Sequence, residues 1–228
     1  MKKLFIKSLF ASFILTLSLN ARLLNAEISY GQLPDGVELV YIQGEYDTET
    51  LKEIANLPIS WAQTIVMLNS DGGSLFDSVS IGSLIRSMGA LTWVLPGDKC
   101  LSECALIWLA GRNRILSSNG VVGFKGMPSM ELTQEQQNLV GPSAIGIGDL
   151  YTKDMQVTGL GFVVLGNYLN KGLGIDFSFV ENFIGTLTSS DDIIELNVDL
   201  LNSYGIYSMF DQNENIKGYL SSANGIDF

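Results

Sequence analysis

The chemistry open to this chain is limited first by a missing residue type: none of its 228 residues is histidine. A Ser-His-Asp triad, a Cys-His pair, a zinc site ligated by histidine and a haem held on histidine are therefore excluded. The two cysteines, Cys100 and Cys104, cannot complete a zinc site by themselves, and a nucleophilic cysteine would lack its usual base. Any catalysis must use other groups.

Both cysteines flank Ser102 in the segment CLSEC. An oxidising compartment favours a disulfide between Cys100 and Cys104, and two buried free thiols are the alternative. In a straight helix the Cβ atoms of residues four apart are separated by about 5–6 Å, which is wider than a relaxed disulfide allows. Pairing therefore predicts a turn, or an irregular helix start, at this segment.

Length and composition predict one globular domain. The chain is 46% hydrophobic and 16% charged, so it can bury a sizeable core. Its formal charge is −11, and binding to a phosphate backbone depends on lysine and arginine. A nucleic-acid partner is therefore excluded.

The first 26 residues have the layout of a secretory signal peptide, with three lysines ahead of an apolar run. That run has about 11 residues, fewer than the roughly 20 that a membrane-spanning helix needs. We expect cleavage after Ala21 or Ala26, export to the periplasm or beyond, and no stable membrane span in the mature protein. Residues 1–26 hold four of the 13 basic residues and no acidic one, so removing them takes the formal charge from −11 to −15.

Strand and helix patterns alternate from residue 37 to residue 124. β-rich runs predict strands at residues 37–42, 64–68, 90–95 and 121–124. Capping residues and apolar spacing predict helices at residues 47–56, 75–88 and 105–110, the last of them buried because it is apolar on every side. The alternation predicts an α/β fold with a largely parallel sheet and flanking helices.

The remaining patterns are less regular. Residues 126–148 contain prolines, glycines and a polar stretch, which predicts a long loop of the kind that often shapes selectivity. Residues 150–171 return to an apolar helical pattern interrupted by glycines, and residues 176–184 predict a further helix.

Three segments in this order resemble a known family: LNSDGGS at residues 68–74, CLSECALIWLAGRNR at residues 100–114 and VVGFKG at residues 121–126. They are similar to the Clp protease proteolytic subunit and its ClpP/crotonase superfamily, and to exported bacterial ClpP-like proteins with a C-x-S-x-C motif. The resemblance covers residues 37–126 well and residues 168–206 weakly. It implies a ClpP/crotonase-like α/β domain over residues 27–228, no cofactor or metal, and assembly into homo-oligomers.

The resemblance also implies an oxyanion site. In the family, the second glycine of the turn and the residue after the serine donate backbone N–H groups to the oxyanion, and these positions are Gly73 and Glu103 here. Removing one such donor typically costs about 3 kcal/mol of transition-state stabilisation. An ordinary tight turn is the alternative for the glycines. Asp71 stands where the family usually has proline, and its carboxylate would oppose an oxyanion.

Ser102 occupies the nucleophile position of the family, although a serine that opens a helix is also a common N-cap. Lys125 stands where the family has its histidine base. Two mechanisms follow. Either burial lowers the pKa of Lys125 until its neutral amine takes the proton of Ser102, or Lys125 stays an ammonium near its ordinary pKa of about 10.4 and the serine is idle. The acidic composition favours the charged form. The third family residue, an aspartate, would fall near Asp191, for which a solvated helix cap is the alternative.

Three functions remain open at this point. The first is a serine hydrolase that cleaves peptides by a Ser-Lys dyad of Ser102 and Lys125. The second is an inactive pseudoenzyme that holds an extended peptide or protein partner in the retained groove. The third, a crotonase-like thioester enzyme, would need coenzyme A, and export argues against it.

Overall fold

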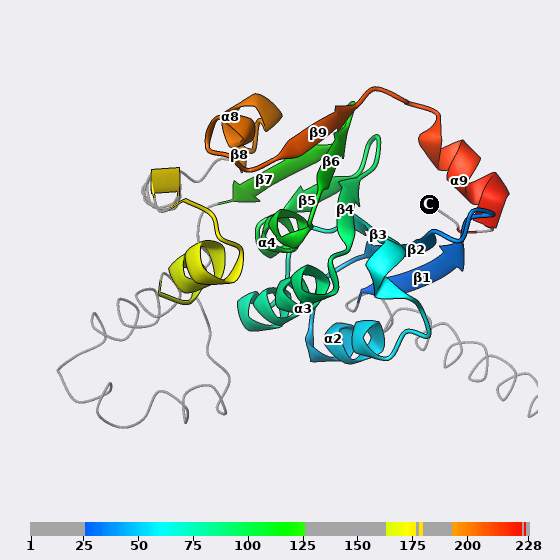
Figure 1. Cartoon of the computed structure of the whole chain (residues 1–228), viewed down its shortest axis with the longest axis horizontal. Coiled ribbons are helices and arrows are strands. Elements are labelled where there is room, and N and C mark those ends of the chain that lie inside the picture. Colours follow the sequence, from blue (N-terminus) through cyan, green and yellow to red (C-terminus); the bar gives the residue numbers. More distant parts are fainter. Residues whose placement is uncertain (1–25, 126–162, 177, 180–192, 225, 227–228) are drawn as a thin grey trace, which may run out of the picture.

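The computed structural model describes residues 26–125, 163–176, 178–179, 193–224 and 226, and of Lys125 it describes only the backbone. Within this part of the chain, six strands form one sheet in the order β1-β2-β3-β4-β6-β9 (Figure 1). Their bounds are Glu27–Gln32 (β1), Glu38–Gln43 (β2), Thr64–Asn69 (β3), Leu91–Val94 (β4), Arg114–Ser117 (β6) and Ser208–Asp211 (β9). All neighbours run parallel except β1, which is antiparallel to β2.

A second sheet of three described strands carries the segment around Ser102. It consists of β5 (Lys99–Leu101), β7 (Val121–Lys125) and β8 (Ile193–Glu195), with β7 in the middle. The pair β5·β7 is parallel, with Leu101 opposite Gly123, and β7·β8 is antiparallel. The short β5 therefore leads from this sheet directly into Ser102.

Helices cover both faces of the large sheet. Those of the described part are α2 (Thr48–Ala55), α3 (Leu75–Met88), α4 (Glu103–Ala110), α8 (Val198–Ser203) and α9 (Ile216–Asn224), with a 3-10 turn at Trp61–Gln63 and a π-helical segment at Tyr168–Gly172. Side chains of α2, α3 and α4 pack on one face, and α9 packs on the other. Figure 1 shows α9 (red) well apart from those three helices.

Alternation along the central strands assigns residues to the two faces. In β2, Val40 and Ile42 join the cluster under α3 and α4, whereas Leu39 and Tyr41 join the cluster under α9. This period of two is what a strand that is buried on both faces requires.

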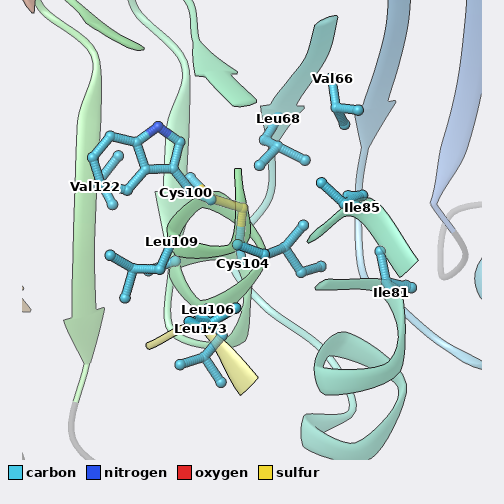
Figure 2. Packing of buried hydrophobic residues seen from close by; sticks show 14 of the residues in the cluster. Val66, Leu68, Ile81, Ile85, Cys100, Cys104, Leu106, Leu109, Val122 and Leu173 are labelled. Atoms are coloured by element: carbon cyan, nitrogen blue, oxygen red, sulfur yellow. A yellow bond between two sulfur atoms is a disulfide. The ribbon is translucent and has the colours of Figure 1, made fainter. Parts of the chain in front are cut away.

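Helix α4 lies at the centre of the larger cluster, with every residue from Cys104 to Ala110 buried. Figure 2 shows Cys100 and Cys104 surrounded by apolar side chains from β3, α3 and β7. Burial of each leucine or isoleucine in such a cluster stabilises the fold by roughly 1.5–3 kcal/mol.

Because α4 is buried, its last carbonyl groups must find partners within the protein. The Tyr168 hydroxyl donates to Leu106 O at 3.0 Å, Thr92 Oγ1 donates to Trp108 O at 2.6 Å, and Arg114 Nε donates to Leu109 O at 2.8 Å. The Arg114 cation also opposes the negative end of the helix dipole. Burial, together with the charge of Arg86, lowers the pKa of Arg114 to about 10, so it stays protonated at neutral pH.

On the opposite face, one buried carboxylate holds α9 against the sheet. Asp98 accepts hydrogen bonds from the Lys217 ammonium and, at 3.4 Å, from the Tyr41 hydroxyl. Burial raises the pKa of Asp98, while the bonds from Lys217 and Tyr41 act in the opposite direction. The polar contact accompanies the apolar packing of Leu220 and Ile226 on this face.

The structure confirms the α/β class and the largely parallel sheet. The predicted strands at 37–42, 64–68, 90–95 and 121–124 are β2, β3, β4 and β7, and the predicted helices are α2, α3 and α4, the last beginning two residues earlier than expected. The sequence patterns missed the strands β1, β5, β6, β8 and β9 and the helices α8 and α9. Of the stretch at 150–171 that was expected to be helical, residues 163–171 are helical and residues 150–162 lie outside the described residues. The signal peptide, the predicted loop at 126–148 and most of the predicted helix at 176–184 lie outside the described residues.

We predict that Lys217→Met lowers the free energy of unfolding by about 3 kcal/mol at neutral pH, because it leaves the carboxylate of Asp98 buried without its cation. The raised pKa of Asp98 sets the sign of the pH dependence: the loss shrinks as pH falls and Asp98 takes up a proton. Urea denaturation at a series of pH values measures it. The matched control is Lys52→Met, which breaks the exposed pair with Glu49 and should cost less than about 1 kcal/mol. Equal losses for the two variants would contradict the role given to Asp98.

Candidate active site

Ser102 sits in a strained turn between β5 and α4. Its backbone has φ 52° and ψ −121°, in the left-handed half of the map that residues other than glycine rarely adopt. Two hydrogen bonds hold the turn: Ser102 N donates to Gly123 O at 2.8 Å, and Ala105 N donates to Ser102 O at 3.0 Å. The side chain makes no capping bond to the helix, so the structure gives no support to the N-cap alternative.

Cys100 and Cys104 form a disulfide across this turn, as the sequence analysis predicted. Cys100 belongs to β5 and Cys104 to the first turn of α4, and their Cα atoms are 5.0 Å apart. The strained residue between them breaks the helical geometry that would keep the sulfur atoms too far apart. Both cysteines are fully buried, and the bond closes the base of the turn that carries Ser102.

The Gly72-Gly73 turn lies directly beside Ser102. A Cβ atom built on Gly72 would stand 3.2 Å from Ser102 Cβ, although the two residues are 30 positions apart in the chain. Backbone hydrogen bonds link the segment to β5, since Ser70 N donates to Lys99 O at 2.7 Å and Leu101 N donates to Ser70 O at 2.9 Å. The glycine turn and the serine turn therefore form one hydrogen-bonded unit.

Tyr46 forms hydrogen bonds with both the glycine turn and the first turn of α4. Its N–H donates to Gly72 O at 3.1 Å, its carbonyl accepts from Ser74 N at 2.9 Å, and its hydroxyl donates to the Sγ atom of Cys104 at 3.2 Å. The side chain is fully buried, and burial raises its pKa, so it stays neutral and acts as a donor. The sequence analysis missed Tyr46, because it is far from both turns in the chain and carries no local motif.

The Glu103 carboxylate reaches back onto the glycine turn. Gly73 N donates to Glu103 Oε2 at 3.4 Å. Burial raises the pKa of Glu103, and the backbone N–H groups of Glu103 and Gly73 partly offset that rise. One of the two backbone groups expected to bind an oxyanion, the N–H of Gly73, thus has an acceptor that the chain itself supplies.

Asp71 faces away from this contact and pairs with Lys99. Lys99 Nζ lies 2.7 Å from Asp71 Oδ1, and both side chains are more than half exposed. The pairing offsets the negative field that Asp71 was expected to place at the turn. An exposed pair of this kind stabilises the fold by no more than about 1 kcal/mol.

Two predicted site residues remain, Lys125 and Asp191. The structure describes the first of them by its backbone alone. Lys125 ends β7, two residues after Gly123, whose carbonyl accepts the hydrogen bond from Ser102. Asp191 lies outside the described residues. Within the described residues, no group of three or more Cys, Asp or Glu side chains is placed to hold a metal ion, and none of the helices is long and apolar enough to cross a membrane.

The fold and the order of elements around Ser102 define the class: the chain has a ClpP/crotonase-like α/β fold, the fold of ClpP-like peptidases. Comparison with solved structures shows this likeness at low identity. A peptidase from Plasmodium falciparum aligns with TM-score 0.51 and 11% identity, over 77% of this chain and 96% of the other. An alanine mutant of the membrane-bound stomatin-specific protease 1510-N aligns with TM-score 0.51 and 16% identity, over 82% and 83%.

A mutant of ClpP1 from Listeria monocytogenes aligns with TM-score 0.49 and 15% identity, over 78% of this chain and 94% of the other. No protein-family model matches the sequence, and no curated protein matches it either. At these identities the likeness establishes the fold, and activity must be argued from the site.

We predict that Gly73→Ala lowers the free energy of unfolding by about 2 kcal/mol or more. Its Cβ would lie 2.5 Å from Tyr46 N and 2.9 Å from Tyr46 Cα, and these backbone atoms cannot rotate away. Gly89→Ala is the matched control: Gly89 has φ +73° with nothing within 4 Å of its Cβ, so it should cost only the left-handed backbone, about 1 kcal/mol. Denaturant unfolding compares the two, and a smaller loss at Gly73 would contradict the close packing of the turn.

Proposed function

We propose that this chain is an exported, ClpP-like serine hydrolase homologue that acts on peptides, with Ser102 as nucleophile and Lys125 as base. The single observation that carries the proposal is the strained turn at Ser102, held beside Gly72 and Gly73. A non-glycine residue persists in such a conformation only where its surroundings demand it, and strain of this kind concentrates at active sites. A nucleophilic serine on a sharp turn from strand to helix is a recurrent arrangement.

In the proposed reaction, the neutral Lys125 amine takes the proton of Ser102, and the Ser102 oxygen attacks the carbonyl carbon of the peptide bond. The carbonyl oxygen becomes negative and accepts N–H bonds from Gly73 and Glu103. The tetrahedral intermediate then expels the amine, which takes the proton from the Lys125 ammonium, and an acyl group remains on Ser102. Water releases that acyl group as a carboxylic acid in the second half of the reaction.

Export is part of this proposal. The signal layout of residues 1–26 supports it, and so does the disulfide, since disulfides persist mainly in oxidising compartments.

The test is the intact mass of the mature protein after exposure to a fluorophosphonate, from about pH 6 to pH 10. We expect one adduct on the parent chain, formed faster as pH rises because the base must be neutral, and labelling reduced at least about 100-fold in Ser102→Ala and Lys125→Ala. The exposed Lys52→Ala is the control and should label like the parent. Absence of an adduct across the whole range, both in the parent and in Glu103→Ala, would overturn the hydrolase proposal.

A second candidate, a pseudoenzyme that binds an extended peptide, is favoured by a specific observation. No described side chain forms a hydrogen bond with the Ser102 hydroxyl, and the chain has no histidine to serve as its base. An exposed sheet edge can hold such a peptide by strand addition, which requires backbone groups but no nucleophile.

For this candidate we predict that Ser102→Ala binds a library of fluorescent extended peptides with the parent's affinity, within about twofold, and that neither protein cleaves them. Fluorescence anisotropy measures binding, and mass spectrometry of the peptides measures cleavage. Cleavage by the parent that is lost in Ser102→Ala would eliminate the pseudoenzyme and support the hydrolase.

A further inference from the structure

The Glu103 side chain fills space that depends on a glycine. A Cβ atom on Gly72 would stand 2.5 Å from Glu103 Oε2 and 3.5 Å from Glu103 N, so any larger residue at position 72 would compete with this carboxylate. The oxygen therefore lies in the gap between the glycine turn and the start of α4. The backbone N–H of Gly73, on one side of this gap, donates to the carboxylate.

The charged groups packed around Glu103 do not compensate its charge. In the glycine turn, Asp71 is paired with Lys99 of β5. The Tyr46 hydroxyl, which donates to Cys104 in the first turn of α4, is neutral. None of the described lysine or arginine side chains forms an ion pair with Glu103. Backbone N–H groups are thus its principal described partners.

We propose that Glu103 closes the candidate oxyanion site from within, its carboxylate accepting the Gly73 N–H bond that the oxygen of a bound carbonyl would need and filling the space beside Gly72. The closure is an autoinhibitory contact: a substrate carbonyl enters only when the carboxylate withdraws or is protonated. Its consequence for catalysis rests on the proposed function, whereas the contact itself does not.

Release of the closure by Glu103 and activation of Lys125 have opposite pH requirements. Because burial raises the pKa of Glu103, protonation releases the N–H groups at a higher pH than for an exposed glutamate. The lysine base must instead be neutral, which an ordinary lysine reaches only near pH 10. At any one pH, therefore, the reaction at Ser102 of the parent protein is slowed either by closure of the site by Glu103 or by protonation of Lys125. The exception is a substrate that displaces the carboxylate.

The first experiment detects the contact without any activity. In ¹H–¹⁵N NMR spectra of the mature protein, the Gly73 amide proton should move as pH falls, with a midpoint above that of an ordinary glutamate, because protonation weakens its hydrogen bond to Glu103. The movement should vanish in Glu103→Gln and persist in Asp71→Asn, which removes the neighbouring carboxylate. A Gly73 signal that does not titrate in the parent, or that still titrates in Glu103→Gln, would overturn the proposal.

The second experiment measures the consequence. Glu103→Ala keeps the backbone N–H of residue 103 and removes the carboxylate, so fluorophosphonate labelling of Ser102 should be at least about tenfold faster than in the parent, equivalent to about 1.4 kcal/mol. Glu49→Ala, an exposed glutamate of α2, is the control and should leave the rate unchanged.

The two arms separate the two proposals. If Gly73 titrates with Glu103 but no variant labels, the closure stands and the hydrolase function fails. If the parent labels and Glu103→Ala labels no faster, the hydrolase stands and the autoinhibition fails.

Discussion

Complete burial of a short helix is the constraint on which the rest of this structure depends. Helix α4 can begin only where the chain leaves the second sheet, because its apolar residues must reach the space between the large sheet and α3. That entry forces Ser102 into a strained turn, and the disulfide and the bond to Gly123 hold the turn in place. The side chains of Thr92, Arg114 and Tyr168 then supply the hydrogen bonds that a buried helix end cannot obtain from water.

The same constraint assembles the candidate site from distant parts of the chain. Tyr46, the glycine turn and β5 are linked by backbone hydrogen bonds that fix where the N–H groups of Gly73 and Glu103 point. Preorganised donors of this kind stabilise developing negative charge effectively, because no reorganisation is needed during the reaction. The proposed acyl-transfer reaction depends on this preorganisation, although the chain lacks the usual base, histidine.

Electrostatics sets this site apart from that general arrangement. Glu103 brings a carboxylate to the backbone donors, and Lys125 replaces an imidazole by an amine with a much higher ordinary pKa. A fold shared with peptidases at 11–16% identity does not decide whether such a site turns over. Under the proposed function the balance between Glu103 and Lys125 decides it, and each of these two side chains can be removed separately.

Local patterns in the sequence predicted the α/β class, the strands β2, β3, β4 and β7 and the helices α2, α3 and α4, and export favoured the pairing of Cys100 with Cys104 over two free thiols. Periodicity, caps and glycine turns are local signals, and each of these elements carries one. The strands β5, β6 and β9 lie outside the β-rich runs from which strands were predicted, and β6 pairs with β9 across 94 positions of the chain, a contact that no local pattern indicates.

At the site, motif order was enough to single out Ser102, Gly73 and Glu103. Only the tertiary structure revealed that Tyr46 clamps the turn, that Lys99 neutralises Asp71, and that the Glu103 carboxylate lies on the N–H groups assigned to an oxyanion. Those contacts join segments that local patterns treat as independent. Packing around α4 is what brings them together.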